Sequence, residues 1–333
     1  MRRLIEKVVK LSSDEAFFRF QNDLARTMYD ALGQGYAAGE GEVPLVKRLI
    51  ESVNDKTHDG IQIHATILHG SRSYVEFNFM DKPVTKELGD MAVISLVTDG
   101  PQRLLQKTCI IQNKKDSGPS WGIDLEQLYL LKNFPTFSGN KGIFRGCHDV
   151  VFRNSSGCLG AYGLFQTPGE MAVVSAPVVT ELLRGRQTLP AAELSVPPQT
   201  AGSRWGAPAS AFPWWLACGR HPKELFFMFE EMMHMHGFPF WCPDAGNGFL
   251  GNVHFSRDLY DFARDWTQAS IGETSVTNGQ IVNAGVDCFS NILLRRAGFR
   301  GLGDLPTGNV FGDMPFEGQL AVMVMHMNVG EKQ

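Results

Sequence analysis

Three polar side chains stand at the ends of two neighbouring apolar segments. Asp90 directly precedes the apolar run 91–97, and Gln112 and Lys114 close the run that begins at residue 104. Residues at i and i+2 of a strand face the same side, so Gln112 and Lys114 point together. If the two runs pair as antiparallel neighbours, Asp90 lies near Gln112. The sequence therefore predicts that the three groups converge at one edge of a sheet.

These residue types suit the hydrolysis of a phosphodiester. A divalent metal ion neutralises the phosphate and makes a water molecule more acidic. Magnesium prefers oxygen ligands and takes few of them from the protein. We expect Asp90 and Gln112 to bind Mg²⁺ or Mn²⁺ through a carboxylate and an amide oxygen. Lys114 would activate the water and stabilise negative charge on the phosphate.

The arrangement resembles the PD-(D/E)xK nuclease superfamily, in the branch with a QxK signature. The segment "ELGD" supplies Asp90, and "IIQNKK" supplies Gln112 and Lys114. The resemblance covers roughly residues 40–135. It implies a restriction-endonuclease-like α/β fold, in which a mixed sheet is flanked by helices. It also implies magnesium-dependent cleavage of DNA, in a setting such as bacterial antiviral defence.

The family also places a glutamate on the helix that precedes the sheet. Glu42 is the first choice for this further catalytic and metal-binding residue, and Glu51 is the second. Family members often carry a polar residue on the helix after the QxK strand, where Gln127 stands here. Glutamine in place of the usual second acid leaves one fewer negative ligand.

Other interpretations stay open. Asp90 could be a turn residue at a strand start, and residues 114–116 could be a solvated strand end. A protein that keeps the nuclease fold without catalysis, and binds nucleic acid or acts as a scaffold, is the alternative function. A third possibility is that residues 185–333 bind a partner or small ligand and control the nuclease.

The elements that would position these residues can be predicted from hydrophobic periodicity. Helical spacing of apolar residues predicts several helices, and alternation or continuous apolar runs predict strands. The predicted helices cover 12–35, 42–54, 124–134, 222–237, 256–269 and 279–298. The predicted strands cover 61–70 and 73–80 as a hairpin, 91–97 and 104–112 as a second hairpin, 148–154, 171–179 and 318–329. The glycine-rich segment 157–170 is expected to form a turn.

The composition of one segment suggests a division of the chain. Residues 185–213 are rich in Pro, Ala, Ser and Gly and lack periodicity, which is typical of a linker or long loop. We therefore expect a nuclease-like domain over 1–184 and a mainly helical C-terminal region over 214–333. That region could also carry a partner or self-association surface.

A second group of metal-ligand types occurs in the C-terminal region. It comprises His234, His236, Cys242 and His254. Zinc can use such ligands. His234 and His236 are two residues apart near the end of a predicted helix, however, and would not face one another. The apolar residues of the same helix predict a packed face or a partner surface.

Composition excludes several other classes. The 333 residues carry a net charge of −4, so a nucleic-acid partner would need a local basic patch. No apolar run reaches the length of a membrane span, and the first residues do not resemble a signal peptide. Six cysteines without a CxxC pair favour reduced thiols and a cytoplasmic location. Phosphate-loop, dinucleotide-binding and nucleophile-elbow motifs are absent.

Overall fold

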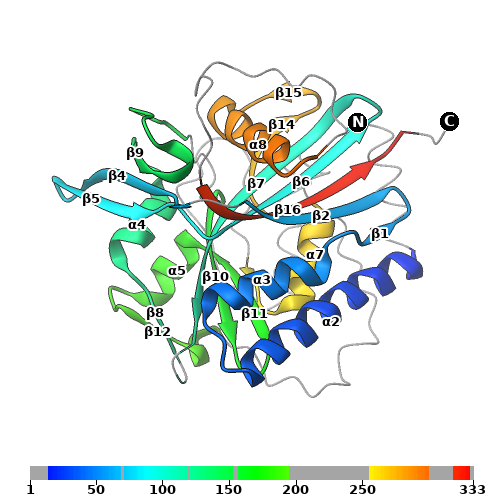
Figure 1. The fold of residues 1–333 in the computed structure, drawn as a ribbon, viewed down its shortest axis with the longest axis horizontal. Coiled ribbons are helices and arrows are strands. Elements are labelled where there is room, and N and C mark those ends of the chain that lie inside the picture. Colours follow the sequence, from blue (N-terminus) through cyan, green and yellow to red (C-terminus); the bar gives the residue numbers. More distant parts are fainter. Residues whose placement is uncertain are drawn as a thin grey trace, which may run out of the picture.

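The described chain is a mixed α/β structure built on one large sheet (Figure 1). It is a computed structural model that describes residues 14–68, 71–116, 118, 120–152, 157–194, 255–299 and 318–330. Helices flank the sheet, in agreement with the predicted class. The predicted helix over 222–237 and the group His234, His236, Cys242 and His254 lie outside the described residues.

The main sheet combines parallel and antiparallel strands. Along its principal path the order is β1 (Thr57–His58), β2 (Ile61–Leu68), β16 (Gly318–Asn328), β6 (Met91–Asp99), β7 (Gln102–Lys115), β10 (Gly160–Gln166), β11 (Glu170–Ser175) and β13 (Phe255–Ser256). β6 and β7 form the predicted antiparallel hairpin, with Met91 opposite Ile111. β10 runs parallel to β7 and follows it through a helical crossover.

Strand β16 lies in the middle of this sheet. It pairs antiparallel with β2 and parallel with β6, so strands distant in the sequence lie side by side (Figure 1). Its residues 320–325 are almost entirely buried, as expected of a strand covered on both faces. The strand itself was predicted, but its central place was not.

This topology corrects the predicted domain division. The C-terminal region contributes β13, β16, β14 (Glu273–Thr277) and β15 (Gln280–Ile281) to the main sheet. Within the described residues it is therefore neither a separate unit nor mainly helical. Residues 188–190, which we expected in the linker, form β12 (Thr188–Pro190), which pairs with β8 (Ser120–Gly122). A 3₁₀ turn, η2 (Ala191–Leu194), follows.

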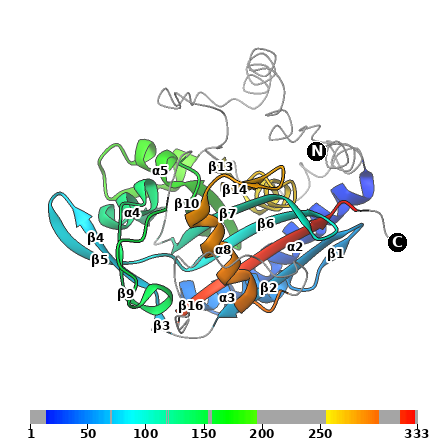
Figure 2. The same cartoon turned by 90° about the horizontal axis from the view of Figure 1, so that it is seen from above.

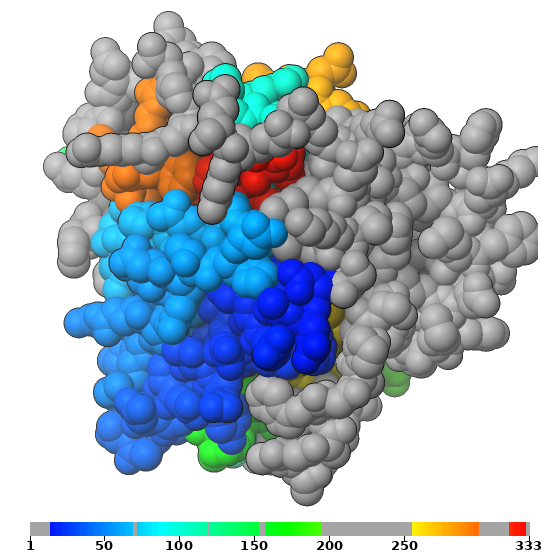
Figure 3. Space-filling view, turned by 90° about the vertical axis from the view of Figure 1, so that its right-hand side faces the viewer, coloured from blue at the N-terminus to red at the C-terminus, as the bar shows by residue number. Residues whose placement is uncertain are grey.

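Three helices cover one face of the sheet. They are α2 (Glu15–Ala37), α3 (Glu42–Val53) and α7 (Leu259–Thr267). In α2, Leu24, Met28 and Leu32 recur at helical spacing and are buried. They pack with apolar residues of α3 and of the strands in one continuous cluster. Figure 3 shows α2 and α3 (blue) as one surface on this side.

The opposite face is covered by three other helices and a small sheet (Figure 2). The helices are α4 (Leu125–Asn133), α5 (Ala176–Leu183) and α8 (Ala284–Arg296). The small sheet contains β4 (Tyr74–Phe79), β5 (Lys82–Glu87) and β9 (Ser138–Lys141), followed by the 3₁₀ turn η1 (Gly142–Phe144). None of the helices in the described ranges is long and apolar enough to cross a membrane.

Several predicted strands are placed differently. β2 does not pair with β4, because β4 pairs with β5 and β9 while β2 pairs with β1 and β16. In the described part of 148–154 there is only an isolated bridge at Val150. The segment 157–170, expected to turn, contains the buried strand β10. The predicted strand 171–179 ends at Ser175, where α5 follows.

Candidate functional site

Asp90 and Gln112 meet where β6 begins and β7 nears its end. The Asp90 amide donates to the carbonyl of Ile111 at 3.0 Å, which extends the hairpin by one residue. Nε2 of Gln112 donates to Oδ2 of Asp90 at 2.5 Å, and the Asn113 amide donates to the same oxygen at 2.7 Å. The predicted proximity of Asp90 and Gln112 is therefore confirmed.

The segment 87–90 that carries Asp90 is fixed by several elements. Its first carbonyl, that of Glu87, accepts a hydrogen bond from Nε2 of Gln127 on α4 at 2.5 Å. The Leu88 amide donates to the carbonyl of Ser73 at 2.7 Å, and the carbonyl of Asp90 accepts from the Ala321 amide of β16 at 3.0 Å. Backbone pairing on both sides fixes the position of the carboxylate.

Gly89 is required at this point by close packing. A Cβ atom there would lie 2.7 Å from Cγ2 of Ile110 and 3.2 Å from the carbonyl oxygen of Ile111. Any side chain at residue 89 would push the segment away from β7. It would thereby move Asp90 away from Gln112.

Lys114 shares the face of β7 that carries Gln112. Gln112 is paired with Tyr162 and Lys114 with Leu164 on β10, and both β10 residues belong to the core under α4 and α5. Lys114 makes no ion pair within 4 Å with the residues that the structure describes. Its charge nevertheless reaches Asp90, because it lowers the pKa of that carboxyl group.

The electrostatic balance at Asp90 is unfavourable to its charge. Burial raises the pKa of Asp90 to about 6. The hydrogen bond from the Asn113 amide and the Lys114 charge oppose this rise, while the negative charge of Glu42 adds to it. A carboxyl group whose pKa is raised towards neutral pH in this way is common in functional sites.

Glu42 reaches the same edge from α3, on the other side of the sheet. Its Oε1 accepts a hydrogen bond from the Lys115 amide at 3.1 Å. Glu51 does not approach this edge through any contact of its side chain. It is exposed and lies 3.7 Å from Lys47 on the same helix. Of the two predicted helix acids, Glu42 is therefore the one at the site.

Two residues of the site, Glu87 and Arg72, were missed by sequence reasoning. Burial raises the pKa of Glu87 to about 7, and the Asp90 charge adds to this effect. Arg72, which lies 3.4 Å from the carboxylate, and Lys114 both lower the same pKa. Glu87 was visible in the quoted "ELGD", three residues before Asp90. Strand alternation could not predict that its side chain lies near Asp90, because β5 ends at Glu87 and residues 88–90 do not continue the strand.

Lys115 points to the opposite face and is anchored there. Its Nζ donates to the carbonyl of Glu40 at 2.6 Å and lies 5.0 Å from the ring centroid of Tyr36. The hydroxyl of Tyr36 donates to Asp116 at 2.8 Å. The end of β7 is therefore tied to the junction of α2 and α3, and it is not the solvated strand end that we had considered.

Asp90 and Gln112 each have one side-chain oxygen that accepts no hydrogen bond from the described residues. Oε1 of Gln112 is buried and lacks a partner. Both hydrogen bonds to the Asp90 side chain go to Oδ2, so Oδ1 accepts none from the described residues. A carboxylate oxygen and an amide oxygen are ligands that Mg²⁺ accepts. Both oxygens are therefore candidate ligands for a divalent cation.

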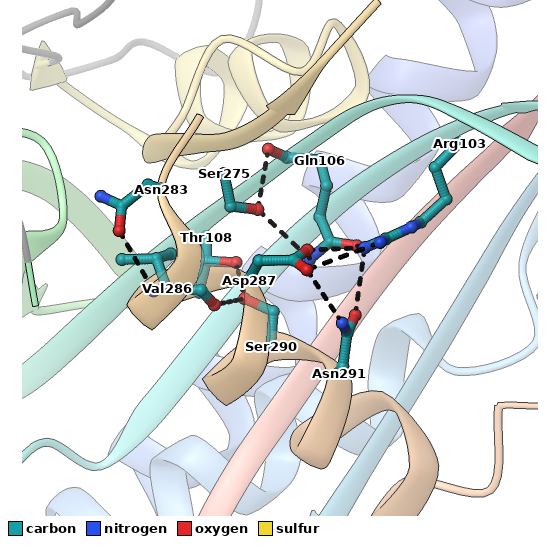
Figure 4. Close-up of polar contacts among 9 residues, drawn as sticks. All are labelled: Arg103, Gln106, Thr108, Ser275, Asn283, Val286, Asp287, Ser290 and Asn291. Carbon is teal, nitrogen blue, oxygen red and sulfur yellow. Dashed lines mark hydrogen bonds and ion pairs between the residues drawn. The ribbon is translucent and has the colours of Figure 1, made fainter. Parts of the chain in front are cut away.

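A second polar cluster lies on the same face of β7, towards the start of that strand (Figure 4). Arg103 Nη1 lies 2.6 Å from Oδ1 of Asp287 on α8, and Gln106 Nε2 donates to the same oxygen at 3.1 Å. Asn291 donates to Oδ2 of Asp287 at 3.1 Å. Gln106 Nε2 also donates to Ser275 at 3.2 Å.

The hydroxyl groups beneath α8 complete this cluster. Thr108 and Ser290 share a hydrogen bond of 2.5 Å, and Ser290 also donates to the carbonyl of Val286 at 2.7 Å (Figure 4). None of the cluster's buried side-chain oxygens or nitrogens lacks a partner. The cluster therefore joins α8 to the sheet and leaves none of its buried polar side-chain atoms without a partner.

Comparisons with known proteins add no relative to this geometry. No family model matches the chain, and neither the curated proteins nor the solved structures gave a match. The function is therefore inferred from the residues at the edge formed by β6 and β7.

Proposed function

We propose that this protein is a metal-dependent nuclease that hydrolyses phosphodiester bonds, with DNA as the expected substrate. One observation carries the proposal: Oδ1 of Asp90 and Oε1 of Gln112 accept no hydrogen bond from the described residues, and Lys114 lies on the same face of the sheet. The QxK resemblance adds bacterial antiviral defence as the proposed setting.

Asp90 and Gln112 would hold the cation, either Mg²⁺ or Mn²⁺, and Glu42 would be an outer ligand. When bound, the cation would supply the positive charge that a phosphodiester needs before it can accept a nucleophile. Asp90 has a raised pKa, so its affinity for a cation increases as the pH rises through about 6.

Lys114 has the role of a cationic group without a fixed partner. It would orient the attacking water and stabilise the negative charge that develops on the phosphate oxygens. Because no described residue forms an ion pair with Lys114, no protein salt bridge would have to break when the phosphate arrives. Glu87 would add a further carboxylate beside the reacting groups.

The second candidate is a nucleic-acid-binding or scaffold protein with an inactive nuclease fold. It is favoured by one observation: in the described ranges, no three His, Cys, Asp or Glu side chains are grouped closely enough to hold a metal ion. Gln112 also brings no negative charge. The two candidates differ in whether a divalent cation binds at Asp90 and supports cleavage.

Thermal unfolding with increasing Mg²⁺ or Mn²⁺ measures this binding without relying on activity. A ligand at 100 times its Kd stabilises the folded state by about 2.7 kcal/mol. We expect the wild type to gain stability, Asp90→Asn to lose this gain and Gln112→Leu to retain part of it. Glu51→Gln, at the exposed acid of α3, is the control and should respond like the wild type.

Cleavage of labelled single- and double-stranded DNA and RNA completes the test. The proposal expects cleavage of DNA that requires a divalent cation and Asp90. A wild type that binds nucleic acid and cleaves none of these substrates with either cation would favour the scaffold alternative.

A further inference from the structure

Arg72 lies at the rim of the proposed site. It belongs to β3 (Ser71–Arg72), which pairs with the first residues of β16. Nη1 of Arg72 lies 3.4 Å from Oε2 of Glu87. The arginine side chain is 51% exposed, whereas that of Glu87 is 13% exposed. The pair therefore combines a buried acid with a cation that solvent and ligands can reach.

The contact between Arg72 and Glu87 uses little of the guanidinium. An arginine has five N–H donors, and strong ion pairs with carboxylates are bidentate at about 2.7–2.9 Å. Here a single donor approaches Glu87 at 3.4 Å. Tyr74 also contributes, after Glu87, to raising the pKa of this side chain. Most of the donors are available to another anion.

The charge of Arg72 is felt at the proposed metal ligand as well. It lowers the pKa of Asp90, although less than the Asn113 amide and Lys114 do. The geometry agrees with this, because Arg72 contacts Glu87, which belongs to the segment 87–90 that carries Asp90.

The charges around Glu87 show why a positively charged side chain is needed at this rim. Three acids, Glu42, Glu87 and Asp90, face two cations, Arg72 and Lys114. The five groups sum to −1 when all are charged, which repels a phosphodiester. A divalent metal ion changes the sum to +1, and removal of Arg72 would then lower it to zero.

Building on the proposed function, we infer that Arg72 binds a phosphate oxygen of the nucleic-acid substrate and exchanges its long contact with Glu87 for the phosphate. The planar guanidinium matches the geometry of a phosphate better than an ammonium group does. Glu87 is the resting partner, which holds the arginine over the site and competes with the substrate for it.

Binding at several salt concentrations tests this role without requiring catalysis. Fluorescence anisotropy with single- and double-stranded oligonucleotides in Ca²⁺ gives the Kd and its salt slope. We expect Arg72→Ala to weaken binding roughly tenfold and to reduce the log–log salt slope by about 1. Arg72→Lys should keep the slope and recover only part of the affinity.

The matched control is an exposed arginine–glutamate pair away from the site. Arg186 lies 2.9 Å from Glu193, and its side chain is 47% exposed. Arg186→Ala should leave both the Kd and the salt slope unchanged. Unfolding curves of all variants should coincide with that of the wild type, because exposed ion pairs contribute little to stability.

Glu87→Gln tests the competition. It removes a rival anion, so we expect tighter binding than in the wild type. This gain in affinity should be smaller in the Arg72→Ala background, because Glu87 then has no arginine to compete for with the substrate phosphate. Equal gains in both backgrounds would show that Glu87 acts only through its overall charge and would contradict the exchange.

The outcomes separate this inference from the nuclease proposal. If the wild type cleaves DNA and folded Arg72→Ala binds with the wild-type Kd and slope, the role of Arg72 is wrong and the nuclease proposal survives. If binding depends on Arg72 but no cation supports cleavage, the nuclease proposal fails and the phosphate contact stands. A wild type that binds no oligonucleotide overturns both.

Discussion

The two polar clusters on β7 share one strand and one face, yet they differ in how their hydrogen bonds are satisfied. Beneath α8, each buried polar side-chain atom of the cluster around Asp287 has a partner. At the other end, Gln112 Oε1 has none, and both burial and the charge of Glu42 oppose ionisation of Asp90. A satisfied buried network stabilises and orders a fold, whereas unpaired atoms and crowded charges cost stability.

The difference indicates which cluster is structural and which has a function. Proteins tolerate local destabilisation where a ligand or a reaction makes use of it. The cluster around Asp287 has nothing left to offer a ligand. The edge at Asp90 has two oxygens that accept no hydrogen bond from the described residues, and the charges of Arg72 and Lys114 act on it. Its cost in stability is explained if a metal ion and a phosphate bind there.

The largest expected effect is on stability, at the satisfied cluster. Asp287→Ala removes the partner of Arg103, Gln106 and Asn291 at once. Breaking a buried charged pair in this way typically costs about 3–5 kcal/mol. Urea denaturation should show this loss, while Glu193→Ala in an exposed pair should change stability by less than about 1 kcal/mol. A small loss for Asp287→Ala would remove the contrast between the two clusters.

The next effect is on activity, at the other cluster. Lys114→Ala should reduce cleavage by about 10²–10³, because a charge that acts in the transition state is typically worth about 3–4 kcal/mol. Its unfolding curve should be unchanged, since Lys114 has no ion pair with the described residues. Lys82→Ala, at an exposed lysine of β5, should change neither property. Full activity of Lys114→Ala would exclude the lysine from catalysis.

A smaller effect with the opposite sign is expected at Asp90. Its carboxyl group has a pKa near 6 in the folded state, above the ordinary value, so the folded protein binds this proton more tightly than the unfolded chain does. The stabilisation from that proton is complete below about pH 4 and is lost as the pH rises through 6. Asp90→Asn should therefore be more stable than the wild type at pH 8, by about 1–2 kcal/mol.

The same comparison at pH 4 serves as the internal check. There the wild-type carboxyl group is already protonated, and the two proteins should unfold at similar urea concentrations. Glu51→Gln should show no pH-dependent gain over the wild type. Should Asp90→Asn be the less stable protein at pH 8, the carboxylate would be part of a stabilising network like that of Asp287.

The smallest effect is expected at Lys115. Lys115→Ala removes a hydrogen bond to the Glu40 carbonyl and a contact with the Tyr36 ring. Together these are worth about 1–2 kcal/mol of stability. Cleavage should fall far less than in Lys114→Ala. The two adjacent lysines would then show opposite patterns, one affecting stability and the other activity, and equal losses of activity would contradict this separation.

The local part of the site could be predicted from the sequence. Two apolar runs separated by a turn form a hairpin, and the period of two places Gln112 and Lys114 together. The pairing then brings Asp90 to Gln112. These inferences need only residues close in the sequence.

The strand β10 could not be predicted, because the packing that requires its glycines exists only in the folded protein. A Cβ atom at Gly160 would lie 2.1 Å from the carbonyl oxygen of Leu131 on α4. At Gly163 it would lie 2.3 Å from Oδ1 of Asn113 on β7. The glycines allow close approach of neighbouring elements, whereas in sequence they are typical of a turn.

Arg72 and Glu87 were missed for a different reason. Arg72 is positioned by the pairing of β3 with β16, and Glu87 by a hydrogen bond from Gln127 on α4. Both depend on contacts between segments far apart in the sequence. Hydrophobic periodicity contains no information about such contacts.

The central place of β16 also determines when the main sheet can be completed during translation. Residues 318–328 form the last of the described helices and strands, so they leave the ribosome after all the others. Until then, the facing edges of β2 and β6 have no partner and are exposed to other nascent chains. The amide of Ala321, which holds the carbonyl of Asp90, arrives in the same step. A partly synthesised chain thus lacks the strand that fixes its proposed catalytic edge, so any activity of that edge has to wait for the synthesis of β16.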